Sequence, residues 1–169
     1  QNIDEKNEIQ ETKLFNTSKR LTRNNHINSF MVSSGYSEVI NYSFISPSMD
    51  FMMGKDSKSI HIKNPLSIEM SVMRTSLLPG LLKNLVYNLQ RQHENIKLFE
   101  SAKVFALNNK LNSEKDVIAG ITYGYRTREQ WGLESIPMDF YDAKGDLELL
   151  FTSLKINHHI SYIKDAHPM

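Results

Sequence analysis

The chain has 169 residues, of which 40% are apolar, so it is long enough for one domain with a real core. Its 20 lysines and arginines nearly balance its 19 aspartates and glutamates, and a formal net charge of +1 gives no broad positive field for a nucleic-acid backbone. The absence of cysteine excludes disulfides and thiolate metal sites, and no apolar run approaches the length of a membrane span. These properties predict a cytoplasmic protein without a membrane partner.

The two ends of the chain predict a piece of a longer protein. Residues 1–12 form a polar lead-in or linker, "QNIDEKNEIQET", and the chain starts at Gln1 without an initiator methionine. Residues 13–169 are expected to form one module that is truncated on its C-terminal side.

The first predicted element is a helix from Lys13 to Ser34. Gly35 ends it, because glycine adopts the left-handed conformation without a side-chain penalty. The β-rich run "YSEVINYSFI", residues 36–45, then predicts a strand that stops at Pro47. The apolar positions of the helix are Leu14, Leu21, Ile27, Phe30 and Met31.

A second helix is predicted in the stretch "NPLSIEMSVMRTSLLPGLLKNLVYNLQRQ", residues 64–92. Ser76 is a plausible N-cap, and Pro79 falls in the first turn, where its missing N–H costs little. The helical spacing of the apolar residues places Leu81, Leu85 and Val86 toward the core. A short strand containing Ile60 and Ile62 precedes this stretch, and residues 48–59 receive no assigned element.

The second half of the chain predicts a hairpin, a helix and a last strand. The runs "NIKLFESAKVFAL" and "DVIAGITYGY" are β-like, and "NNKLNSEK" between them has turn composition. Residues 139–156 then predict a helix, and "HHISYIKD", residues 158–165, a strand. Irregular alternation of helices and mostly antiparallel strands indicates an α+β fold with an antiparallel sheet flanked by helices.

Four carboxylates begin the last predicted helix, and two readings of them are open. Three of them could share a helix face and bind a hard cation. Acids at a helix start also cap its free N–H groups and complement its dipole, which is the favoured interpretation. His158 and His159 would point to opposite sides of a strand, so no metal site is expected. The four acids are Asp139, Asp142, Asp146 and Glu148.

The segment "YGYRTREQW", residues 123–131, combines basic and aromatic residues. It could stack on bases and touch phosphates, but the low net charge favours an exposed hairpin end or a protein contact. No phosphate-binding loop, dinucleotide fingerprint or strained nucleophile turn is present.

Four ordered segments carry a resemblance to a known family: "GYSEVINYSF", "NPLSIEMSVMRTSLLPGLLKNLVYNLQRQ", "LFESAKVF" and "DFYDAKGDLELL". Their order and spacing resemble the central catalytic-like module of the β subunit of bacterial phenylalanyl-tRNA synthetase. The resemblance implies a class II aminoacyl-tRNA synthetase fold in a degenerate, partial copy. It further implies an (αβ)₂ heterotetramer in which the α subunit uses phenylalanine, ATP and Mg²⁺ to charge the tRNA. No cofactor is expected in this chain itself.

The signatures of the family can be placed on this sequence residue by residue. The first signature, which serves the subunit interface, corresponds to the first helix and strand, although Tyr42 stands where a proline is expected. The second signature places an ATP-binding arginine and an acid at Ala106 and Asn108, so the resemblance implies that the catalytic groups are lost. The third signature would lie beyond Met169. The interface candidates are Leu14, Leu21, Ile27, Phe30, Met31 and Tyr36.

Two functions are therefore weighed. The first is a non-catalytic module for subunit assembly, in which Arg74 is structural and bound by Glu69, Glu100 or carbonyls of the "NPLS" turn. The second is an accessory nucleotide- or tRNA-binding module. Its phosphate-contacting residues would be Arg74, Arg91, Arg126 and Arg128.

Overall fold

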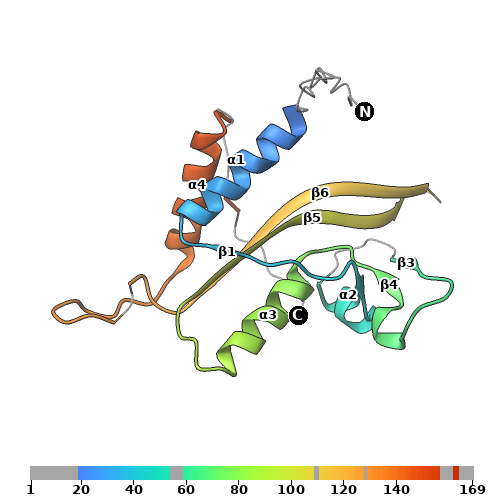
Figure 1. Cartoon of the computed structure of the whole chain (residues 1–169), viewed down its shortest axis with the longest axis horizontal. Coiled ribbons are helices and arrows are strands. Elements are labelled where there is room, and N and C mark those ends of the chain that lie inside the picture. Colours follow the sequence, from blue (N-terminus) through green and yellow to red (C-terminus); the bar gives the residue numbers. More distant parts are fainter. Residues whose placement is uncertain (1–18, 54–58, 109–110, 128, 157–161, 164–169) are drawn as a thin grey trace, which may run out of the picture.

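The computed structural model describes residues 19–53, 59–108, 111–127, 129–156 and 162–163. It forms two small sheets with helices around them (Figure 1). None of the helices in these residues is both long and apolar enough to cross a membrane. In chain order the elements are α1 (Lys19–Ser33), β1 (Ser37–Glu38), β2 (Phe44–Ile45), α2 (Pro47–Met53), β3 (Ile60–His61), the 3₁₀ helix η1 (Ile68–Met70), β4 (Val72–Met73), α3 (Leu78–Leu89), β5 (Ile96–Asn108), β6 (Leu111–Tyr123) and α4 (Phe140–Ser153).

A long antiparallel hairpin dominates the structure. Strands β5 and β6 pair from Ile96↔Tyr123 to Asn108↔Leu111, and β1 adds to β5 in parallel to complete the first sheet. The second sheet is antiparallel, with the order β2-β4-β3. The mostly antiparallel pairing and the flanking helices agree with the predicted α+β class.

The predicted eight-residue connection of the hairpin is wrong, because pairing continues through most of "NNKLNSEK". Of its polar residues, Glu114 and Lys115 are described as exposed strand residues. Glu114 forms a cross-strand ion pair with Lys103, in which Nζ lies 2.5 Å from Oε2. The turn-like composition of this run therefore does not mark a long loop, because most of its residues belong to the paired strands.

The predicted strand of residues 36–45 is also interrupted. Its first part pairs with β5 and its last part pairs with β4 in the other sheet. Between them the backbone N–H of Asn41 turns toward the carboxylate of Glu100, 3.4 Å away, and leaves the ladder. The chain then forms α2, which the sequence did not predict, and Ser46 Oγ accepts from the N–H of Met49 near its start.

Helices α1 and α4 lie next to each other and cover one face of the first sheet (Figure 1). The period of two along a strand sends Phe99 toward these helices, where it packs with Met31, Tyr36 and Leu150. Half-buried side chains complete this cluster: Ile27, Phe30, Ile118 and Leu154.

Helix α3 covers the opposite face. Leu81 is fully buried there with Ile96 and Leu98, and Leu85 packs at the edge of the cluster. Val86 is 50% exposed, so its predicted place in the core is wrong. The helix begins one residue later than a Ser76 cap requires, yet Ser76 Oγ still accepts from the N–H of Leu78 at 3.2 Å.

Helix α4 begins with a capping box. Asp139 accepts from the N–H groups of Tyr141 and Asp142, and the Asp142 carboxylate accepts from the N–H of Asp139. This backbone N–H, and then the guanidinium of Arg126, lower the pKa of the Asp142 carboxyl. Asp139 and Asp142 thus cap the helix, whereas Asp146 binds Tyr36 and Lys97 and Glu148 pairs with Lys144. The described residues contain no group of three or more histidines or acids that could hold a metal ion. The predicted strand of residues 158–165 falls almost wholly outside the described residues.

The packing of α3 gives a test of the fold. Leu81→Ala should lower the free energy of unfolding by about 2–5 kcal/mol, because it leaves a cavity between α3 and β5. Lys83→Ala, on the exposed side of the same helix, should lower it by less than about 0.5 kcal/mol. Urea unfolding followed by circular dichroism measures both, and equal midpoints would contradict the packing of this face.

Candidate functional site: a buried ion pair and an exposed apolar edge

Arg74 lies between β4 and α3 and is inside the molecule. Its side chain is 4% exposed, and its Nη1 donates to Oε1 of Glu100 at 2.6 Å. Its Nε donates to the carbonyl of Lys103 at 3.1 Å. The backbone of Arg74 also bonds on both sides, donating to the carbonyl of Ser43 and accepting from the N–H of Phe105. Arg74 therefore ties the second sheet to β5 through both its main chain and its side chain.

Glu100 is the other half of the pair and is only 2% exposed. Its second oxygen accepts from Nδ2 of Asn41 at 2.8 Å, and Asn41 in turn accepts from Nδ2 of Asn84 on α3 at 3.0 Å. Gly80 leaves room for Asn41, because a Cβ at that position would lie 2.9 Å from the Asn41 side chain. A continuous polar network thus joins β5, the segment after β1, and α3.

A second buried acid, Asp50, fixes α2 to the same region. Its Oδ1 accepts from both the N–H and the hydroxyl of Thr75, at 2.9 and 2.7 Å, and its Oδ2 accepts from Ser59. The sequence analysis missed Asp50, since no helix was predicted around it. Its position within the apolar run "SMDFMM" was the available signal, because a charge among apolar residues needs a buried partner.

The two positions that the family resemblance assigns to catalysis lie at the end of β5. Ala106 pairs with Ser113 of β6, whose hydroxyl donates to the Ala106 carbonyl at 3.1 Å. Because side chains alternate, Ala106 is on the same side of β5 as Glu100. A methyl group therefore stands at the position to which the family resemblance assigns a phosphate-binding guanidinium. Asn108 ends the strand, and its side chain is outside the described residues.

The three described arginines of the alternative function lie at separate places, and each has an intramolecular partner. Arg91 stacks on Tyr87, with 3.3 Å between the guanidinium carbon and the ring centroid. Arg126 binds Asp139 and Asp142 at the start of α4. Arg74 is neutralised by Glu100, and Arg128 is outside the described residues.

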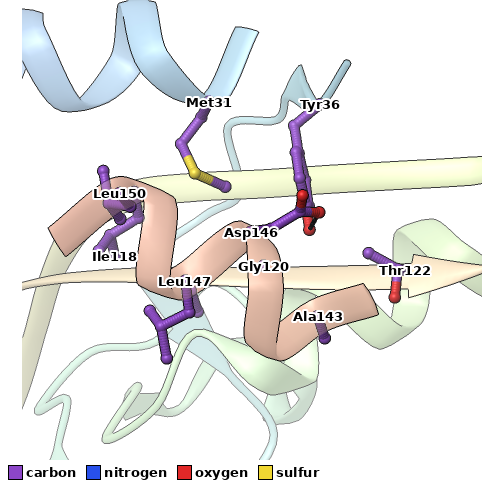
Figure 2. Close-up of a pocket in the computed structure, with 10 residues that line it drawn as sticks. Met31, Tyr36, Ile118, Gly120, Thr122, Ala143, Asp146, Leu147 and Leu150 are labelled. Atoms are coloured by element: carbon purple, nitrogen blue, oxygen red, sulfur yellow. Dashed lines mark hydrogen bonds between the residues drawn. The ribbon is translucent and has the colours of Figure 1, made fainter. Parts of the chain in front are cut away.

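A pocket of about 230 Å³ opens between α1, β6 and α4 (Figure 2). Asp146 contributes the charge in its wall: Oδ2 accepts from the Tyr36 hydroxyl at 2.8 Å and from Lys97 Nζ at 3.0 Å. Burial of Tyr36, and then its hydrogen bond to Asp146, raise the pKa of the phenol. The remaining walls are largely aliphatic, including Met31, Ile118, Leu147 and Leu150. The bonds of Asp146 to Tyr36 and Lys97 anchor α4 to the sheet. The pocket is a small gap between these packed elements.

The predicted interface residues of α1 divide between the core and the undescribed part of the chain. Met31 and Tyr36 are buried in the cluster beneath α1, and Ile27 and Phe30 pack against it half-buried. Leu14 is outside the described residues, as is the side chain of Leu21. The described part of this apolar stripe therefore packs within this chain.

Large apolar side chains are exposed instead at two places, on the segment between β1 and β2 and around η1. Ile40 is 92% exposed and Tyr42 is 73% exposed. Tyr42, Phe44 and Ile68 line one hollow between this segment and η1. We call the exposed apolar residues between β1 and β2 and around η1 the edge patch, and its members are Ile40, Tyr42, Phe44, Leu66 and Ile68.

The sequence model of one family, described as the phenylalanyl-tRNA synthetase beta chain CLM domain, matches residues 8–169. The chain belongs to this family. Curated phenylalanine–tRNA ligase beta subunits agree: that of Nitrosospira multiformis is 43% identical over 131 residues, and that of Yersinia pestis is 39% identical over 140 residues. The family resemblance read from the four sequence segments is thereby confirmed.

The chain spans only a small part of the length of these relatives. The alignments cover 78% and 81% of the chain but only 16% and 18% of the Nitrosospira and Yersinia subunits. A solved structure of Desulfitobacterium hafniense PylSc, a pyrrolysyl tRNA synthetase, superimposes with a TM-score of 0.62 over 86% of this chain and 50% of that one, at 15% sequence identity. This similarity confirms the class II synthetase-like fold.

The buried ion pair of this CLM domain gives a second test. Glu100→Gln should lower the free energy of unfolding by about 3–5 kcal/mol, because it leaves the Arg74 guanidinium buried without a counter-charge. The double variant Arg74→Met/Glu100→Leu should regain most of that loss, since it removes both charges. Glu114→Gln, which removes an exposed ion pair of the same strands, should stay close to wild type. Urea unfolding of the four proteins decides, and a Glu100→Gln variant as stable as wild type would contradict a structural role.

Proposed function

We propose that this chain is a non-catalytic class II module of the β subunit of phenylalanine–tRNA ligase, used for subunit assembly and for support of the α subunit. The observation that carries the proposal is the edge patch, in which Ile40 and Tyr42 expose most of their apolar surface. Ile40 and Tyr42 follow the first helix and Gly35, on the segment that the family resemblance assigns to the interface signature of class II enzymes.

The energetics of the edge patch support an assembly role. Exposed clusters of large apolar side chains on a folded domain mark binding surfaces, since burying them on a partner is favourable. The patch contains an aromatic residue, Tyr42, and such residues are enriched at the centres of protein interfaces. The position of Tyr42, where other class II enzymes have a proline, adds apolar area to this surface.

The chemistry on β5 supports the non-catalytic part of the proposal. Adenylate formation needs a cation at the α-phosphate, and Ala106 cannot stabilise developing phosphate charge. If the nearby Arg74 turned to bind phosphate, the buried carboxylate of Glu100 would lose its counter-charge, which is strongly unfavourable. We therefore assign ATP, Mg²⁺ and the charging of tRNA to the α subunit of an (αβ)₂ enzyme in the cytoplasm.

The alternative, an accessory nucleotide- or tRNA-binding module, is not favoured. Arg74, Arg91 and Arg126 each have an intramolecular partner, as described above. Binding phosphate through them would first require breaking those contacts.

Capture of the α subunit tests the proposal. When the complete β subunit is co-expressed with tagged α subunit, Ile40→Asp or Tyr42→Asp should lower the apparent affinity at least about tenfold, because a carboxylate would have to be desolvated in the interface. Leu149→Asp is the matched control, since Leu149 is an exposed apolar residue of α4, away from β2 and η1 (Figure 1). Sedimentation velocity gives the affinities. Unchanged affinity of both edge-patch variants would contradict the proposal.

A further inference from the structure

An arm of residues 124–138 leaves the end of β6 and returns to α4. Its base is closed by the bridge Tyr125↔Pro137 and by two backbone hydrogen bonds, Arg126 N–H to Ile136 at 2.9 Å and Met138 N–H to Gly124 at 2.8 Å. Gly124 has φ +106°, and a Cβ there would lie 2.0 Å from the carbonyl of Glu94, so this turn requires glycine. The base of the arm is therefore tightly defined.

Side chains fix the base of the arm to its surroundings on both sides. The N–H of Tyr125 donates to Oδ1 of Asn95 at 2.6 Å, in the segment before β5. Arg126 donates to Asp139 and Asp142, the two residues that cap α4. These bonds orient the arm relative to the sheet without using the residues at its tip.

The tip of the arm carries apolar side chains in solvent. Trp131 is fully exposed, and Leu133 and Ile136 are also exposed. Figure 1 shows the arm projecting beyond the ends of β5 and β6, at the opposite end of the molecule from β2 and η1. A tryptophan has the largest apolar surface of any side chain, so a fixed arm that holds it in water indicates a surface built for docking.

We propose that this arm inserts Trp131 into an apolar pocket formed by another segment of the same β subunit, outside these 169 residues. The inference rests on the proposed function, which makes the chain one module of a β subunit. Relatives are about six times longer than the aligned region, since that region is 16% to 18% of their length, so most of the β polypeptide is available to cover the arm. The α subunit is expected at the edge patch, and Figure 1 shows the neighbouring elements α2 and β4 at the other end of the molecule from the arm.

The charges of the arm define the chemistry of this pocket. Glu129 and Glu134 flank Trp131 and are exposed, so the pocket should present basic side chains at its rim. The arm carries two arginines and two glutamates, so it has no net positive charge to attract a nucleic-acid backbone, and Arg126 is already engaged by Asp139 and Asp142. An indole contact with a protein pocket is therefore favoured over stacking on a base of RNA.

Photo-crosslinking in the assembled αβ enzyme identifies the occupant directly. The complete β subunit carries p-benzoylphenylalanine in place of Trp131, and irradiated products are mapped by mass spectrometry. We expect a cross-link within the β subunit, to a segment outside this domain. A cross-link to the α subunit or to added tRNA, or no cross-link at all, would overturn the inference. The same probe at the exposed Phe51 of α2 is the matched control and should not reach that segment.

A second measurement does not depend on the photo-probe. With 5-fluorotryptophan in the β subunit, the ¹⁹F resonance missing from Trp131→Phe belongs to Trp131, the one tryptophan of this domain. Its H₂O/D₂O isotope shift should be well below that of free 5-fluorotryptophan, and a shift equal to that of the free amino acid would overturn the docking. If the α subunit is captured while Trp131 stays solvent-exposed, the inference fails and the proposed function stands. If Trp131 is protected but α is not captured, the proposed function fails alone.

Discussion

The ion pair between Arg74 and Glu100 is the constraint on which the arrangement of this domain depends. Both side chains are buried, and desolvation of two charges is repaid only when each finds a partner and further hydrogen bonds. Asn41 and the carbonyl of Lys103 supply those bonds. Satisfying this one pair fixes the approach of the β4–α3 connection to β5, the turn after β1, and through Asn84 the position of α3.

The alternation of side chains along β5 separates two environments. Phe99 points into the apolar cluster beneath α1 and α4, while its neighbour Glu100 points into the polar network. The polar side is also the side of Ala106, where the resemblance to class II enzymes places an ATP-binding arginine. The buried guanidinium of Arg74 lies on this side and is held in an internal ion pair. The domain therefore keeps the sheet of the fold and uses this charge for its own architecture. Exposed apolar side chains lie at both ends of the domain, in the edge patch at one end and at Trp131 of the arm at the other.

The sequence predicted much of this domain, and its errors have physical causes. Helical periodicity located α3, and the four ordered segments identified the family, because these signals span many residues. The place of Val86 in the core was wrong, since a stripe of apolar residues does not show which side another element will cover.

The strand of residues 36–45 was drawn as continuous because its β propensity is uniform. Its interruption depends on the bond of Asn41 to Glu100, which is 59 residues away in the chain. Helix α2 and Asp50 were missed for the same reason, because Asp50 is held by Thr75 and Ser59 and not by its sequence neighbours. Glu100 was among the partners considered for Arg74, but no local pattern could select it over Glu69.

The central claim is that Arg74 belongs to the internal architecture of the domain and not to a phosphate site. Isothermal titration calorimetry of the domain with ATP and Mg²⁺ tests it most directly. We expect no binding heat up to millimolar ATP for the wild-type domain, and the same result for the double variant Arg74→Met/Glu100→Leu. Micromolar binding by the wild-type domain that is lost in the double variant would contradict it.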